Sequence, residues 1–153
     1  MNHELHHSAK RVKAMTNAAI TADTDGANVD LAGSSALGAL VIVNCGVTAG
    51  PADATNFWTF KLKEADDDGT GSPGSYTAVD SADMVGQYVV EGGTDGAFAV
   101  VNDAAEDDAV YSVSYVGRKP WIRVTADATL SPGSTPISAV AVLYPLGNTA
   151  NAS

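Results

Sequence analysis

The sequence is poor in the residues on which catalysis and covalent cross-linking depend. Its three histidines, His3, His6 and His7, all fall near the N-terminus, so the rest of the chain has no imidazole base. The single cysteine, Cys45, excludes a disulfide bond within the chain, and its position in an apolar run is typical of a small buried side chain. A nucleophile needs a neighbouring base, which Cys45 lacks. We therefore expect no enzymatic activity and no cofactor.

No set of metal ligands is complete either. The histidines belong to a terminal segment without fixed geometry, which makes a weak metal site. The stretch Asp23 to Gly26 resembles the start of an EF-hand loop, but its glycine comes too early and no glutamate follows at the required spacing. The acidic stretches 66–69 and 106–108 are interpreted as solvated loop tips. The sequence therefore predicts no metal site.

Positive charge and long apolar runs are also scarce. Eight Lys and Arg oppose eighteen Asp and Glu, which gives a formal net charge of −10 and disfavours nucleic acid as a partner. The basic pair Arg118–Lys119, flanked by Tyr115 and Trp121, is interpreted as a hairpin tip rather than a nucleic-acid patch. No segment reaches the roughly 18–20 apolar residues of a membrane span, and the N-terminus does not resemble a secretory signal. We expect no membrane partner and a chain made in the host cytoplasm.

What the sequence does contain favours short strands. Valine is frequent, and 15 glycines and 6 prolines supply turns. The pattern predicts strands at residues 29–31, 37–43, 56–64, 76–79, 87–91, 97–101, 110–116, 121–126 and 137–144, with one helical turn within 80–85. Strands of this length separated by turns every 8–12 residues are typical of an antiparallel sandwich. We predict an all-β, jelly-roll or immunoglobulin-like β-sandwich of about eight to nine strands.

Period-two alternation indicates which side chains face the core of this sandwich. Trp58, Phe60 and Leu62 alternate with polar residues, and the stretch 121–126 alternates in the same way. The predicted core comprises Val41, Val43, Trp58, Phe60, Leu62, Val113, Ile122, Val124, Val140 and Val142. We divide the chain into an N-terminal arm (1–16), a sandwich domain (17–147) and a polar tail (148–153).

Several segments, taken in order, resemble a known family. They are Asn17–Ala22, Asp25–Gly33, Phe60–Gly69 with Tyr76–Val79, Tyr115–Val124 and Ile137–Leu143. This succession of turns and strands resembles small virion proteins encoded beside the major capsid gene in tailed-phage and prophage genomes. The resemblance runs from about residue 10 to the end of the chain and includes no catalytic signature.

The resemblance implies a decoration, or cement, protein on the outer surface of a tailed-phage head, with the major capsid protein as its partner. A head–tail neck or tail component is one alternative. A carbohydrate-binding sandwich in which an exposed aromatic such as Trp121 stacks on sugars is another. We also predict a homotrimer.

We predict that the arm takes part in anchoring the protein, because its cations stand apart from an acidic body. The candidate contact residues are Lys10, Arg11, Val12, Lys13 and Met15. The cations would pair with carboxylates on a neighbour or on the shell, while Val12 and Met15 would bury apolar area at the same contact.

Overall fold

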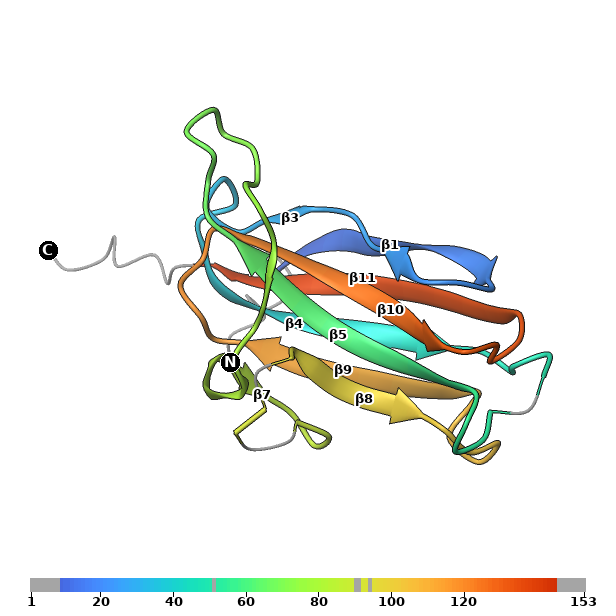
Figure 1. Cartoon of the computed structure of the whole chain (residues 1–153). Helices are drawn as coiled ribbons and strands as arrows, with labels where there is room; N and C mark the ends of the chain where they lie inside the picture. Colours follow the sequence, from blue (N-terminus) through green and yellow to red (C-terminus); the bar gives the residue numbers. More distant parts are fainter. Residues whose placement is uncertain (1–8, 51, 90–91, 94, 146–153) are drawn as a thin grey trace, which may run out of the picture.

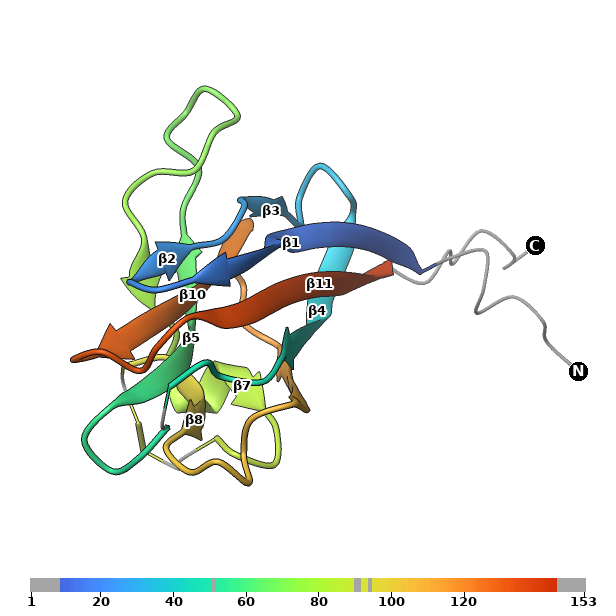
Figure 2. The same cartoon turned by 90° about the vertical axis from the view of Figure 1, so that its right-hand side faces the viewer.

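The alternating segments of the sequence form two antiparallel sheets that pack face to face as a β-sandwich (Figure 1). The computed structural model describes residues 9–50, 52–89, 92–93 and 95–145. Sheet A has the strand order β1 (Lys10–Ile20), β11 (Thr135–Pro145), β4 (Ala36–Cys45), β9 (Ala109–Tyr115) and β7 (Met84–Val85). Figure 2 shows β1, β11 and β4 side by side.

Sheet B is built on the long pairing of β10 (Trp121–Thr129) with β5 (Phe57–Ala65). The short strands β2 (Thr24–Asp25) and β3 (Val29–Asp30) pair with β10, and β6 (Thr77–Ala78) and β8 (Ala97–Val101) pair with β5. A short 3₁₀ helix, η1 (Ser81–Asp83), precedes β7. The predicted all-β sandwich is confirmed, and the described residues form eleven strands in place of the eight to nine expected. Among the described residues, no helix has the length and apolarity that a membrane crossing needs.

The core lies between the sheets, and alternation predicts most of it correctly. Trp58, Phe60 and Leu62 of β5 are fully buried, whereas Lys61 and Lys63, which alternate with them, lie on the outer side. The predicted core residues of β4, β9 and β10 are buried as well: Val41, Val43, Val113, Ile122 and Val124.

The prediction for β11 is wrong by one residue. Val140 is 40% exposed and Val142 is half-buried, while Ala139, Ala141 and Leu143 face the core. Residues 139–143 are apolar without interruption, so their sequence contains no alternation that would show which set points inward. A shift of one residue turns every side chain of a strand to the opposite face. Val140 and Val142 therefore belong to the outer face of sheet A.

The N-terminal segment also differs from the prediction. From Lys10 onward the expected arm is strand β1, which pairs with β11 along its whole length. Register shifts between Lys13 and Met15, and between Met15 and Ala18, interrupt the alternation. Bulges of this kind place residues three apart on the same face, so Val12 and Met15 both turn toward the core. The period-two alternation that would mark a strand is therefore not visible in this part of the sequence. Residues 1–8 of the arm, and the polar tail 148–153, lie outside the described residues.

The segment between β6 and β8 is less regular than predicted. The expected helical turn within 80–85 is found as η1, whose N-cap Asp80 accepts a hydrogen bond from the Ala82 N–H. The strand expected at 87–91 is absent from residues 87–89, which form a turn, and residues 90–91 lie outside the described part. The nearby Gly86, with two further glycines at 92–93, favours a turn over a strand here.

Candidate functional site: the outer face of sheet A

Strand β1 is the edge of sheet A, and its three cations lie on the surface. Lys10, Arg11 and Lys13 are exposed, as the sequence predicts. The Lys10 ammonium donates a hydrogen bond to the Ser34 hydroxyl at 2.9 Å. The two apolar candidates differ from the prediction, because Met15 is only 4% exposed and Val12 is half-buried against the core. The structure therefore keeps the cations as candidate contact residues and assigns Met15 to the core.

Arg11 and Lys13 border an apolar stripe that the sequence analysis missed. Directly opposite side chains in an antiparallel pair share one face, and the register places Arg11 opposite Val142 and Lys13 opposite Val140. On the next strand, Leu40 lies opposite Val142 and Ile42 opposite Val140. The outer face of sheet A thus has two valines, a leucine and an isoleucine in two adjacent rows, with one cation at the β1 end of each row.

The strands of sheet A contain no carboxylate. None of the chain's eighteen Asp and Glu occurs in β1, β4, β7, β9 or β11, whereas three of its eight Lys and Arg occur in β1. Beyond Leu40 and Ile42 the two rows continue with the small polar residues Ser114 and Ser112 of β9. We refer to this surface, composed of Arg11, Lys13, Leu40, Ile42, Ser112, Ser114, Val140 and Val142, as the acid-free face.

The outer face of sheet B has the opposite character. Its cations are each paired with an aspartate: Lys61 lies 3.0 Å from Asp127, and Arg123 lies 3.1 Å from Asp25. The Arg123 guanidinium also lies over the Tyr76 ring, 4.2 Å from its centroid. Trp121 is half-buried at the end of the same face. Because these charges are largely neutralised by one another, the face attracts a charged partner only weakly.

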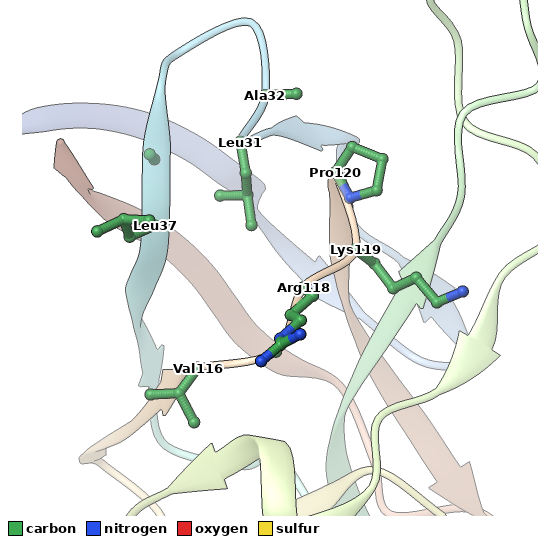
Figure 3. A pocket seen from close by; sticks show the side chains of 9 residues that line it. Leu31, Ala32, Leu37, Val116, Arg118, Lys119 and Pro120 are labelled. Carbon is green, nitrogen blue, oxygen red and sulfur yellow. The ribbon is translucent and has the colours of Figure 1, made fainter. Parts of the chain in front are cut away.

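A pocket of about 490 Å³ opens at one end of the sandwich, between the segment 31–37 and the connection 116–120 (Figure 3). Leu31, Leu37, Val116 and Pro120 supply its apolar lining, and Arg118 extends beside Val116. Lys119 instead forms an ion pair with Asp66. A hydrogen bond holds the connection 116–120 in place, since the Tyr115 hydroxyl accepts from the Lys119 N–H at 2.9 Å. The predicted hairpin tip is wrong, because this connection joins β9 of sheet A to β10 of sheet B, although an aromatic neighbour does hold it.

The acidic stretches have structural explanations in the fold. The Asp23 carboxylate accepts a hydrogen bond from the Ala128 N–H at 2.7 Å, and Asp67 and Asp68 accept from backbone N–H groups of their own loop. Gly26 is needed because a Cβ atom here would lie 2.3 Å from the Ala14 carbonyl oxygen and 2.8 Å from the Val124 carbonyl oxygen. Within the ranges that the structure describes, no three His, Cys, Asp or Glu side chains gather as a metal site. The three histidines lie outside those ranges.

Cys45 is enclosed in the core at the end of β4. Its side chain has no exposed surface, and burial raises the pKa of the thiol to about 11. Asp107 and Asp108 act in the same direction, because nearby negative charge opposes thiolate formation. A thiol reagent reacts with the thiolate, so this environment suppresses nucleophilic chemistry at Cys45.

We expect the folded protein to react with a thiol reagent at neutral pH at least about a hundredfold more slowly than the urea-unfolded chain. The raised pKa lowers the fraction of Cys45 in the thiolate form, and burial keeps the reagent away from the sulfur atom. The measurement is the rate of release of the coloured thiolate from an aromatic disulfide reagent, with and without urea. Rapid labelling of the folded protein would show that Cys45 is open to solvent.

Comparison with known proteins gives little further information. No protein-family model and no curated protein sequence matches the chain. One solved structure with a similar arrangement is VP2 in a subviral particle of infectious bursal disease virus, at 14% identity and a TM-score of 0.32. That similarity covers 92% of this chain and 33% of VP2, so the chain spans about a third of the length of the viral protein. A likeness this distant carries no argument about function.

Proposed function

We propose that the chain is a virion structural protein that decorates the outer surface of a tailed-phage head and stabilises it by binding the major capsid protein. The observation that carries the proposal is the segregation of charge. The chain has a net charge of −10, yet the strands of one whole sheet contain no carboxylate and one edge of that sheet has three cations. This is the arrangement expected of a protein that presents one face to a partner and keeps an acidic remainder in solvent.

The physical requirements of decoration fit this architecture. A shell offers many identical sites, so the protein needs a rigid scaffold and one complementary face, and no reacting groups. A closely packed sandwich provides the rigidity. If three copies associate, each needs only modest affinity, because linked contacts bind together far more tightly than any one of them. The homotrimer is therefore part of the proposal.

Copy number tests the proposal directly. We expect quantitative mass spectrometry of purified particles to find this chain in numbers comparable with the major capsid protein, on the order of hundreds of copies. A neck or tail position instead predicts one ring, about six or twelve copies. Sedimentation of the free protein at several concentrations tests the trimer separately. A particle that contains one ring of copies, or none, would contradict decoration.

A further inference from the structure

We propose that the acid-free face is the surface that docks on the shell, and that the capsid protein presents to it an apolar patch bordered by carboxylates that meet Arg11 and Lys13. This inference rests on the proposed function and specifies the side of the sandwich and the chemistry of its partner. The sandwich would then lie with sheet A against the shell and sheet B toward solvent.

The apolar stripe supplies the first argument. Val140 is 40% exposed, and its neighbours Leu40, Ile42 and Val142 are only half-buried, although they stand at the centre of a sheet. In a two-sheet sandwich, the residues that alternate with the core ones normally point into water and are polar, as they are on β5. Four aliphatic side chains in two adjacent rows depart from that pattern. Covering them removes apolar surface from water and stabilises a complex by roughly 25 cal/mol per Å².

The free cations supply the second argument. Lys61, Lys63, Lys119 and Arg123 each lie within ion-pair distance of an aspartate. Arg11 and Lys13 form no ion pair with any residue in the described part of the chain, despite the excess of acids. Both point to the same side as the apolar stripe. A partner with carboxylates along this border would neutralise Arg11 and Lys13. These charge pairs would fix the orientation of the partner as well as attract it.

A second copy that docks through the same face does not provide this chemistry, and the aspartates on the outer face of its sheet B are already paired with cations. Two acid-free faces packed against each other would bring cations and apolar groups together without a carboxylate between them. Nucleic acid does not provide it either, because it offers the stripe no apolar surface and would be repelled by the acidic remainder. A protein surface with an apolar centre and an acidic border provides both contacts, because its centre covers the apolar stripe and its carboxylates pair with the cations.

The fold offers a matched pair of valines for the test. Val140 on sheet A and Val100 on sheet B are each 40% exposed, and both lie within strands. Val100 pairs with Thr59, which places it on the far side of the sandwich. Replacing either by glutamate changes size, charge and strand propensity equally. In addition, Lys13 lies opposite Val140 and can accommodate the new carboxylate in the free protein.

The experiment measures binding of the full-length protein to undecorated shells assembled from the proposed partner, the major capsid protein. We expect Val140→Glu to weaken binding by about tenfold or more, because a charge is buried at the contact, and Val100→Glu to stay within about twofold of wild type. The doubly reversed variant Arg11→Glu/Lys13→Glu should weaken binding by a similar factor at low salt and by less at high salt. Far-UV circular dichroism and urea unfolding confirm that each variant is folded.

The outcomes separate the two proposals. If wild type does not bind the shells, decoration itself is wrong. If wild type binds and the two valine variants bind equally well, decoration stands and the docking face is wrong. Cations on an edge strand also discourage pairing with a second sheet. A charge reversal that causes aggregation while leaving shell binding unchanged would assign Arg11 and Lys13 that role and overturn the inference. Loss of self-association in Val140→Glu would also overturn the inference, because it would show that the acid-free face binds a second copy of the chain.

Discussion

Replacement of Trp58 by alanine is expected to lower the free energy of unfolding by about 3–5 kcal/mol, the range typical of large-to-small substitutions in a packed core. The Trp58 side chain has no exposed surface and is the largest fully buried side chain of the protein. Its loss removes apolar contacts from both sheets and leaves a cavity that the surrounding strands fill only in part. For a domain of this size, the melting temperature should fall by roughly 10 °C.

A polar contact adds to this effect. The indole Nε1 donates to the Thr135 hydroxyl at 2.8 Å, and that hydroxyl lies 3.2 Å from the Thr48 hydroxyl. Thr135 has no exposed surface, so the three groups form a chain of hydrogen bonds within the core. Thr135→Val keeps the shape of the site but leaves the indole N–H without an acceptor. We expect it to lower the stability by about 1–3 kcal/mol, which is less than the loss in Trp58→Ala.

Urea unfolding followed by circular dichroism measures both variants on one scale. Val100→Glu is a suitable control, because it alters an exposed position on the same sheet as Trp58. A loss of under about 1 kcal/mol in Trp58→Ala would mean that the core collapses onto the vacated space and that Trp58 is not its centre.

The sequence predicts the fold class and most of the core because the informative strands have one apolar and one polar face. On β5 and β10 the alternation is visible in the residues themselves. On β11 it is not, because both faces are apolar. The outward valines of β11 thus looked like core residues, although the structure places them on the acid-free face. The uninterrupted apolar run that makes the core prediction wrong for β11 therefore also forms part of the candidate site.

The candidate site depends on pairings between distant parts of the chain, which local patterns do not show. Arg11 and Val142 lie at opposite ends of the sequence, and Leu40 belongs to a third segment, yet the register places them in one row. The sequence identifies the cations by their separation from the acids, but not the apolar groups beside them. From the sequence, Met15 is instead expected beside the cations, but the bulge in β1 turns its side chain into the core.

Stability is expected to fall steeply as the pH rises above about 9–10, because three buried groups resist ionisation only in the folded protein. Burial raises the pKa of Cys45 to about 11 and that of Tyr111 to about 12. Burial also raises the pKa of Tyr115, and its hydroxyl adds to this by donating a hydrogen bond to the Glu64 carboxylate at 2.6 Å. In the unfolded chain these groups ionise at their ordinary, lower pKa values.

The sign follows from proton binding. Between the ordinary and the raised pKa values the unfolded state holds fewer protons than the folded state, so the free energy of unfolding decreases with pH. The stabilising contribution is complete below the ordinary pKa values and is lost as the pH rises through the raised ones. Ion pairs of lysine weaken in the same range, so tyrosine variants are needed to isolate the buried hydroxyls.

Urea midpoints measured at intervals between about pH 8 and 11.5 test this expectation. Wild type should lose stability throughout the upper half of that range. The double variant Tyr111→Phe/Tyr115→Phe should start from a lower stability, because the hydrogen bonds to the Glu106 carbonyl and the Glu64 carboxylate are gone. Its stability should nevertheless fall less steeply with pH. Tyr144→Phe, which replaces an exposed tyrosine, is the matched control for the loss of a tyrosine hydroxyl. Equal slopes in the double variant and wild type would show that the buried tyrosines do not set the alkaline limit, and would assign it to lysine or Cys45.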